Sequence, residues 1–371
     1  MEPKSKPAQM LAPGDHAPWF HAAALSGNPS YAFDTAAGRH IVLLFLGAAK
    51  LAPAAEALAL ARRERALFDD RDASIFRITV DPEDAAQGRI AQQLPGLRFF
   101  LDYDREVSRL YGAAEDAGYR PHWLVLDPAL RVAGRFPIDR GEEALALLRT
   151  RIAAAANVEQ WAPVLVVHDI VEPALCAELI RGYEASGGEP SGFMREVDGK
   201  TVMLLDPAHK QRRDWTIGDE KVRRALHARI VRRLCPAVAR GLGFRATRIE
   251  RYIVACYEAR AGHFRPHRDN TTKGTAHRRF AVTINLNAGD YDGGDVRFPE
   301  FGRRTYRAPT GGAIVFSCSL LHEATPVTRG TRYAFLPFLY DEEGARLRAA
   351  NNPHLGEGVG AYRMGDSRVG G

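Results

Sequence analysis

The sequence predicts a multidomain chain, in which an α/β domain is followed by a domain of short β-strands with flanking helices. Three observations lead to this prediction. The chain has 371 residues, which exceeds the size of a usual single domain. Its first half alternates strand-like with helix-like segments. From Arg248 onward it becomes a series of short strands separated by turns.

The first half supplies the α/β pattern. Residues 41–46 (IVLLFL) form an apolar run of buried-strand length, and the Ala, Leu, Arg and Glu content of residues 53–68 favours a helix. Further strands are expected at 74–80, 98–101 and 123–126, a short helix at 89–94, and an amphipathic helix at 142–155.

Residues 10–150 resemble the peroxiredoxin and redoxin branch of the thioredoxin fold. The resemblance rests on residues 11–20 (LAPGDHAPWF), the IVLLFL strand, the turn at Asp81 and Pro82, and residues 120–127 (RPHWLVLD). It implies a thioredoxin-like sheet.

This chain lacks the cysteine thiol on which the chemistry of that family depends. In that family the nucleophilic cysteine follows the first long strand, but here residues 46–56 read LGAAKLAPAAE. Thiol peroxidase chemistry needs a thiolate. We therefore expect a degenerate module at 10–152, which serves client docking, substrate presentation or homodimerisation, or has a purely structural role.

The domain boundary is expected at residues 153–159, before the proline of Trp161-Ala-Pro163. The second domain is predicted to span 160–345, followed by a tail at 346–371. It should begin with a strand at 164–167, a helix at 169–184 and a long helix at 219–242.

Candidate metal ligands lie in the second half. His267 and Asp269 form the H-x-D motif of this chain, and residues i and i+2 of an extended segment project from the same face. His322 lies 55 residues downstream, just past an apolar strand at 313–317. Two histidines and one carboxylate with open positions are the facial triad of non-haem iron(II) oxygenases, whereas zinc normally prefers other sites.

A candidate anion anchor accompanies these ligands. Arg332 follows His322 by ten residues, and its planar guanidinium suits the distal carboxylate of 2-oxoglutarate. Tyr257, ten residues before His267, is expected to add a hydroxyl to that carboxylate, with core packing as the alternative.

Residues 160–345 resemble the prolyl 4-hydroxylase-like 2-oxoglutarate/iron(II) dioxygenases, a double-stranded β-helix (jelly-roll) family. The resemblance rests on the order of motifs in the sequence, which is Tyr257, H-x-D, the strand 279–286, Gly293-Gly294, the P-x-x-G turn at 309–312, His322, Pro326-Val327, Gly330 and Arg332. It implies that His267, Asp269 and His322 bind catalytic Fe(2+), and that Arg332 and Tyr257 bind 2-oxoglutarate. The family often has lysine where this chain has Arg332, and the loop 270–278 leaves the substrate open.

The function implied is a hydroxylase that couples oxidative decarboxylation of 2-oxoglutarate by O2 to hydroxylation of a C–H bond, with ascorbate as a further candidate cofactor. The substrate would be a prolyl or other protein residue, or alternatively a small molecule or free amino acid. A non-catalytic metal-binding or sensing protein is the remaining alternative, because fold and motif alone do not fix function.

Other residues near the motifs carry simpler interpretations. His263 and His277 are expected to be polar surface residues. The arginines at 265, 268, 278 and 279 are expected to be solvated, with Arg268 pointing away from the ligands. Arg212 and Arg213 would clamp an anionic substrate or lie on the surface. Gly293 and Gly294 are expected to supply positive φ at a turn.

Composition and charge are ordinary. Hydrophobic residues make up 46% and charged residues 26% of the chain. Residues 161–371 carry 32 Lys and Arg against 24 Asp and Glu, whereas residues 1–160 carry 19 against 21. The excess suits an anionic small substrate, but the basic residues are scattered, so no nucleic-acid partner is expected.

Neither a targeting segment nor a membrane span is predicted. The first twenty residues have no apolar run behind their lysines, and later apolar runs fall far short of the roughly 20 residues of a bilayer helix. We expect a cytoplasmic protein without membrane association. No C-x-x-C pair occurs, which argues for reduced thiols at Cys176, Cys235, Cys256 and Cys318.

Overall fold

The computed structural model describes residues 10–116, 118–155 and 160–363. The chain divides into two compact units, and the division in the sequence lies between Gln160 and Trp161. The boundary expected at 153–159 and the tail expected at 346–371 lie partly outside the described residues. No helix in the described ranges is long and apolar enough to cross a membrane.

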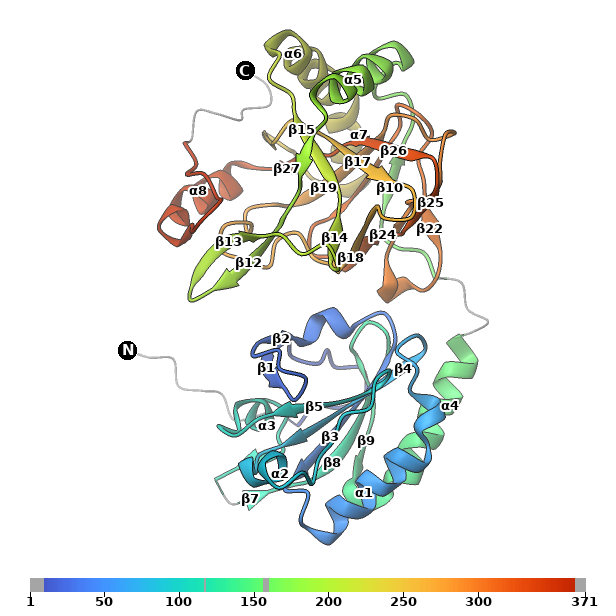
Figure 1. Ribbon diagram of the computed structural model, residues 1–371, viewed down its shortest axis with the longest axis vertical. Coiled ribbons are helices and arrows are strands. Elements are labelled where there is room, and N and C mark those ends of the chain that lie inside the picture. The colour runs from blue at the N-terminus through green and yellow to red at the C-terminus, as the bar shows by residue number, and fades with distance from the viewer. Residues whose placement is uncertain (1–9, 117, 156–159, 364–371) are drawn as a thin grey trace. The chain divides into compact units, whose positions relative to one another are not determined.

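The first unit is an α/β domain built on one mixed sheet (Figure 1). Its strands β3, β4 and β5 are parallel, and β8 and β9 continue the sheet antiparallel. The order across the sheet is β2 (Tyr31–Ala32), β1 (His21–Ala24), β5 (Leu97–Leu101), β4 (Ala73–Thr79), β3 (His40–Gly47), β8 (His122–Leu126) and β9 (Val132–Pro137). A small hairpin and four helices complete the unit, namely β6 (Ala114–Glu115), β7 (Gly118–Tyr119), α1 (Ala52–Arg63), α2 (Pro82–Ala86), α3 (Glu106–Leu110) and α4 (Gly141–Ala155).

The predicted thioredoxin-like sheet is confirmed. The IVLLFL run forms the fully buried strand β3 inside the sheet, and α1 and α4 cover one face of this sheet (Figure 1). Leu44 of β3, Leu58 of α1 and Leu145 of α4 belong to the same buried cluster. The short helix predicted at 89–94 is wrong. The helix lies earlier, at α2, because Asp81 caps it by accepting from the Glu83 N–H and a proline follows at the first helical position.

A buried carboxylate lies beside the segment in which the related family has its cysteine. Asp84 of α2 accepts hydrogen bonds from the Ala49 N–H at 2.8 Å and from the Thr79 hydroxyl at 2.6 Å. Arg89 donates to its other oxygen at 2.8 Å. Asp84 is fully buried. The backbone donor ahead of α1 is therefore paired with a carboxylate inside the fold.

The second unit contains two antiparallel sheets and confirms the predicted double-stranded β-helix class (Figure 1). The larger sheet runs β10 (Leu165–Val167), β23 (Ala313–Ser317), β19 (Phe280–Asn285), β26 (Thr331–Phe335), β17 (Ile253–Glu258), β15 (Arg213–Thr216) and β11 (Glu189–Pro190), with β27 (Phe338–Tyr340) joining β19 to β16 (Arg248–Glu250). The smaller sheet runs β14 (Lys210–Gln211), β18 (His263–His267), β24 (His322–Ala324), β21 (Val296–Arg297) and β22 (Thr305–Tyr306).

The two sheets share an apolar interior. Ala255 of β17 and Ala334 of β26, from the larger sheet, belong to one buried cluster with Ala324 of β24, from the smaller sheet. Phe264 of β18 packs against this cluster. The inner faces of both sheets therefore meet, and residues that alternate inward along each strand share one interior. A hairpin of β12 (Phe193–Val197) and β13 (Lys200–Leu204) lies outside the two sheets, as does a short antiparallel pair formed by β20 (Asp292–Gly293) and β25 (Val327–Arg329).

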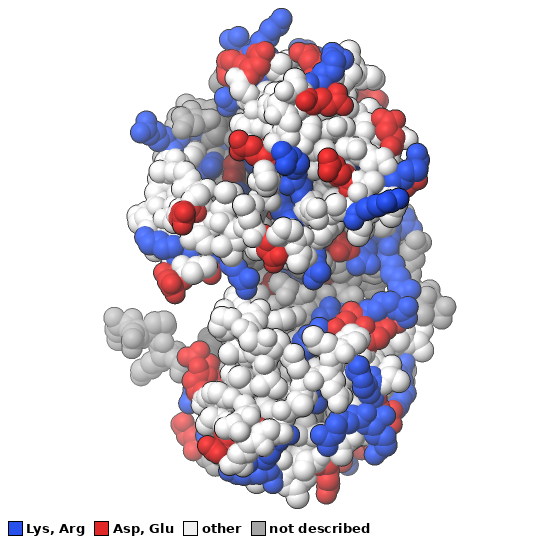
Figure 2. All heavy atoms as spheres, in the orientation of Figure 1, with Lys and Arg blue, Asp and Glu red and all other residues white. Residues whose placement is uncertain are grey.

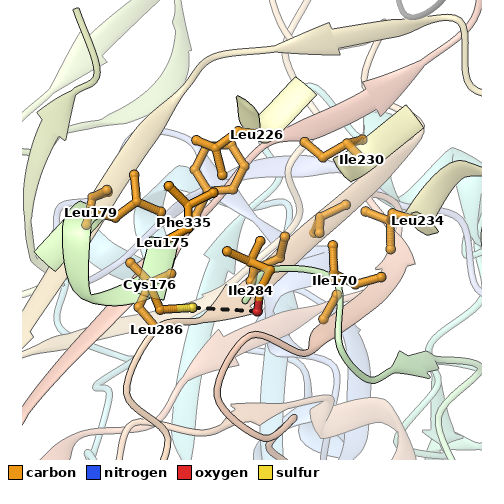
Figure 3. Packing of buried hydrophobic residues seen from close by; sticks show 14 of the residues in the cluster. Ile170, Leu175, Cys176, Leu179, Leu226, Ile230, Leu234, Ile284, Leu286 and Phe335 are labelled. Carbon is orange, nitrogen blue, oxygen red and sulfur yellow. Dashed lines mark hydrogen bonds between the residues drawn. The ribbon is translucent and has the colours of Figure 1, made fainter. Parts of the chain in front are cut away.

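Helices cover the outer face of the larger sheet. Leu179 of α5, Leu226 of α6 and Ile284 of β19 belong to one buried cluster, which Figure 3 shows from close by. The long helix predicted at 219–242 is helical throughout but contains a π-helical segment, Ile230–Leu234, before a proline that cannot donate within the helix. The α-helices described in this unit are α5 (Pro173–Ser186), α6 (Glu220–Arg229), α7 (Cys235–Leu242) and α8 (Glu342–Ala350). Helix α8 continues past residue 345, where the second domain was predicted to end.

Charged side chains of both signs are interspersed on the face of the molecule drawn in Figure 2. This distribution agrees with the scattered positions of basic residues in the sequence. All four cysteines are free thiols, and three of them are buried.

We predict that Asp84→Ala destabilises the first unit by about 3 kcal/mol, because the change leaves the Ala49 N–H and the Arg89 guanidinium without their buried partner. Hydrogen exchange by mass spectrometry on peptides from β3 and β4 measures the loss. Glu83→Ala is the matched control, since this neighbouring carboxylate is exposed. Equal protection in the two variants would contradict the prediction.

Candidate functional site

Three predicted ligands converge between β18 and β24. His267 ends β18, His322 begins β24, and the two residues are direct cross-strand partners. Asp269 follows two residues after the end of β18, and its oxygens lie 3.7 Å from His267 Nε2 and 3.3 Å from His322 Nε2. The ligand atoms of the three residues all lie within 4.8 Å of one another. This spacing allows one cation to contact all three.

Both imidazoles are oriented by the backbone. His267 Nδ1 lies 2.7 Å from the Arg265 carbonyl oxygen, and His322 Nδ1 lies 3.0 Å from the Leu320 carbonyl oxygen. A carbonyl only accepts, so each Nδ1 carries the proton and each Nε2 keeps its lone pair. The rings also pack against aromatic side chains, Phe264 on His267 and Phe316 on His322. The tautomer and the orientation that metal binding requires are thus built into the fold.

The local electrostatics favour the ligand forms of His267 and Asp269. Burial, together with the neighbouring His322, lowers the pKa of His267 to about 4. Burial opposes ionisation of Asp269, but His322 and His267 outweigh it and hold the pKa of this carboxyl well below its usual range. At neutral pH the site therefore offers a neutral imidazole beside a carboxylate.

The anion anchor lies on the larger sheet. Arg332 of β26 and Tyr257 of β17 are cross-strand partners, and the guanidinium carbon lies 4.9 Å from the centre of the phenol ring. Arg332 is only 2% exposed and donates to the Thr283 hydroxyl at 2.9 Å. Alternation along β19 and β26 places Thr283 and Arg332 on the inner face, opposite to the outward Ile284.

Two buried polar atoms beside this anchor have no hydrogen-bond partner among the described residues. They are Arg332 Nε and the Tyr291 hydroxyl. A Cβ at Gly294 would lie 3.1 Å from Arg332 Cδ and 3.5 Å from Tyr291 Cε2, so the two side chains lie close together. Burial raises the pKa of Tyr291, and the positive charge of Arg332 lowers it in part. Buried donors without partners are costly. A carboxylate between them would satisfy both.

The residues present fit the implied metal and cosubstrate. Two histidines and one carboxylate make up the candidate metal cluster found in the described ranges, and a site with three protein ligands leaves positions open for other groups. The unpaired Arg332 Nε and Tyr291 hydroxyl suit the distal carboxylate of a dicarboxylic acid.

Several predictions about neighbouring residues need correction. Arg268, predicted to be solvated, is buried and donates to the Ser319 carbonyl. His277 and Arg278, predicted on the surface, are buried because both bind the buried Glu250 carboxylate, at 2.8 Å and 2.7 Å. Arg278 also donates to the Asp269 carbonyl, so this network supports a metal ligand. Glu250 has no motif around it, and the sequence analysis missed it.

Other expectations hold or gain detail. Arg265 is exposed, as predicted, and Arg213 is exposed and donates to loop carbonyls. His263 is half-buried with Nδ1 on the Ala261 carbonyl. Gly294 has a φ of 67°, and a Cβ there would lie 3.1 Å from Arg332 Cδ, so this glycine also lets the backbone approach the anchor.

Arg212 and two polar residues of the anchor complete the site. Arg212 is buried rather than on the surface, and it donates to the Tyr257 hydroxyl at 3.3 Å. Sequence analysis also missed Thr283 and Tyr291. Thr283 could have been found in the sequence, because it places a hydroxyl at the centre of an apolar strand. Tyr291 lies in a turn, and no feature of the sequence around it indicates a role in the site.

Comparisons with known proteins follow the division into two units. Residues 252–340 match the family model of the 2OG-Fe(II) oxygenase superfamily, and residues 13–134 match that of the AhpC/TSA family. A PKHD-type hydroxylase of Synechococcus sp. (strain JA-2-3B'a(2-13)) is 35% identical over 92 residues, which cover 23% of this chain and 41% of that protein. One from Nitrobacter winogradskyi is 47% identical over 47 residues, which cover 12% of this chain and 21% of that protein.

Solved structures similar to each half are also known. A prolyl-4-hydroxylase of Pseudomonas putida covers 51% of this chain and 98% of its own, with 20% identity and a TM-score of 0.38. AhpC of Mycobacterium tuberculosis covers 40% of this chain and 97% of its own, with 20% identity and a TM-score of 0.33. The two family models match in the order of the two units, AhpC/TSA at residues 13–134 of the first and 2OG-Fe(II) oxygenase at residues 252–340 of the second.

Proposed function

We propose that this protein is an iron(II)- and 2-oxoglutarate-dependent hydroxylase. One observation carries the proposal. A triad in which both Nε2 atoms face the Asp269 carboxylate lies in the same unit as a buried arginine with an unpaired Nε, Arg332, on the facing sheet. A metal-binding sensor would need the triad, but it would not need a buried cation without a carboxylate partner.

The chain's own residues bind and orient the reactants. His267, Asp269 and His322 would hold iron(II), which together with 2-oxoglutarate and O2 supplies the oxidant for C–H hydroxylation. Arg332 and Tyr291 would bind the distal carboxylate of 2-oxoglutarate and fix its orientation. The apolar side chains between the sheets exclude water from this region, which strengthens each polar contact inside it.

We propose a protein residue, prolyl residues included, as the substrate class. The support is the resemblance of residues 160–345 to the prolyl 4-hydroxylase-like dioxygenases. The curated PKHD-type hydroxylases are similar in sequence, and the chain spans about two-fifths of the Synechococcus protein. Substrate-stimulated conversion of 2-oxoglutarate to succinate, measured with proline-containing peptides and with free amino acids, tests this choice. Stimulation by free amino acids alone would replace it with a small-molecule hydroxylase.

We further propose that the first unit serves docking, dimerisation or substrate presentation rather than redox catalysis. Residues 46–56, directly after β3, contain no cysteine, and the carboxylate of Asp84 binds the backbone N–H of Ala49 in that segment. This arrangement supports a stable scaffold without a thiol nucleophile.

We predict that His267→Ala weakens the affinity for a divalent metal more than about a hundredfold. Loss of a residue that only hydrogen-bonds to a metal ligand lowers metal affinity about tenfold to a hundredfold, and loss of a ligand itself should lower it further. Anaerobic calorimetry with iron(II) measures the change. His263→Ala is the matched control, since this histidine lies on the same strand and also has Nδ1 on a backbone carbonyl. Metal affinity equal to that of the control variant would remove His267 from the site.

We predict a weak visible charge-transfer band when iron(II) and 2-oxoglutarate are added to the protein without oxygen. Arg332→Ala should weaken 2-oxoglutarate binding roughly a hundredfold, because it removes the buried partner of a carboxylate. Arg329→Ala is the control, since this arginine is exposed and paired with Asp292. Bound iron without a band in the unmodified protein would favour the sensing function.

A further inference from the structure

Three side chains form a row across the larger sheet. Tyr257 of β17 lies opposite Arg332 of β26. On the other side of β17, Arg213 of β15 lies opposite Cys256, so the preceding Arg212 lies alongside Tyr257. The phenol ring is thus flanked by two guanidinium groups, with their carbons 4.9 Å and 5.8 Å from the ring centre. Strand alternation places all three on the inner face.

Arg212 has polar partners at both terminal nitrogens, Nη1 and Nη2, whereas its buried Nε has none among the described residues. Its Nη2 donates to the Asp214 carboxylate at 2.6 Å and to the Ser191 hydroxyl at 3.1 Å. Ser191 in turn donates to the same Asp214 oxygen at 2.6 Å and accepts from Lys210 at 2.7 Å. Burial opposes the charge of Arg212, but Asp214 and Tyr257 outweigh this effect and raise the pKa of Arg212. The guanidinium therefore stays charged and fixed in place.

The remaining contact of Arg212 determines the direction of a proton. Arg212 Nη1 donates to the Tyr257 hydroxyl oxygen at 3.3 Å. A guanidinium has no acceptor, so the phenol oxygen must accept here and its own proton must point elsewhere. No acceptor for this proton is recorded within the described ranges. The phenol is thus prepared as a donor beside Arg332, whose Nε is also unpaired.

We propose that Arg212, fixed by Asp214, is a positioning residue that directs the hydroxyl proton of Tyr257 toward bound 2-oxoglutarate. This inference rests on the proposed function. It assigns a role to an ion pair that would otherwise be only a structural feature of the strand β15. Buried ion pairs often add little to stability, so a role in orientation accounts better for its retention.

The test is a double-mutant cycle read by equilibrium binding. Calorimetry measures 2-oxoglutarate affinity of the full chain loaded with manganese(II), which binds without turnover. The cycle compares three variants. The first carries Tyr257→Phe, the second (the paired variant) carries both Arg212→Gln and Asp214→Asn, and the third (the combined variant) carries all three substitutions. The paired change leaves no buried carboxylate without its cation. Arg213→Gln is the matched control, since it removes the same charge from the neighbouring exposed position.

We expect Tyr257→Phe and the paired variant each to bind 2-oxoglutarate about tenfold more weakly, as for loss of one hydrogen bond to a charged group. The combined variant should lose no more than Tyr257→Phe alone, because Arg212 acts through that hydroxyl. Manganese(II) affinity and the affinity of the Arg213→Gln variant should stay unchanged. If the paired variant does not fold, Arg212→Lys replaces it, since an ammonium lacks the planar fork that reaches both partners.

Two results would overturn the inference. Unchanged 2-oxoglutarate affinity in the Arg212 variants would leave the ion pair with a structural role. If the loss of 2-oxoglutarate affinity in the combined variant equals the product of the two separate losses, Arg212 acts on the cosubstrate directly through its charge. Absence of 2-oxoglutarate binding in the unmodified, manganese-loaded protein would instead refute the proposed function, so the two failures are distinguishable.

Discussion

The antiparallel pairing of β18 with β24 is the constraint on which the rest of the site depends. This register places His267 directly opposite His322, and a shift by one residue would turn one imidazole to the other face of the sheet. Both Nδ1 atoms then bind carbonyls two residues earlier in their own chain segments, so the lone pairs of Nε2 point toward Asp269. The aromatic rings of Phe264 and Phe316, and the bond of Arg278 to the Asp269 carbonyl, hold the three side chains in this arrangement.

The second requirement is the burial of positive charge, which the fold meets with dedicated carboxylates. Arg278 is paired with Glu250, and Arg212 is paired with Asp214. Arg332 differs, because its recorded side-chain hydrogen bond is to a neutral hydroxyl, that of Thr283. An unneutralised guanidinium in the interior is costly unless an anion joins it. The contrast with Arg212 and Arg278 indicates where an anionic cosubstrate would bind.

The first unit keeps the sheet of the AhpC/TSA family, which it resembles, but has no cysteine in the segment that follows β3. A thiolate at the start of α1 would be stabilised by backbone donors. Here the Ala49 N–H already binds the Asp84 carboxylate, which Thr79 and Arg89 hold in place. The fold therefore stays intact because its central strand and helices bury the same apolar faces, whereas the reactive group is replaced by an internal hydrogen-bond network.

The sequence by itself determined the two domain classes and the strands that carry the apolar core, and it named the triad and Arg332 as candidates for the site. These features depend on local periodicity and on short motifs, which a linear pattern records. Only the tertiary structure decided that Arg212, Glu250 and Tyr291 belong to the site, and that His277 and Arg278 are buried. Their positions depend on which strands become neighbours and on which carboxylate each cation meets. Those pairings join residues far apart in the chain, and no local pattern specifies them.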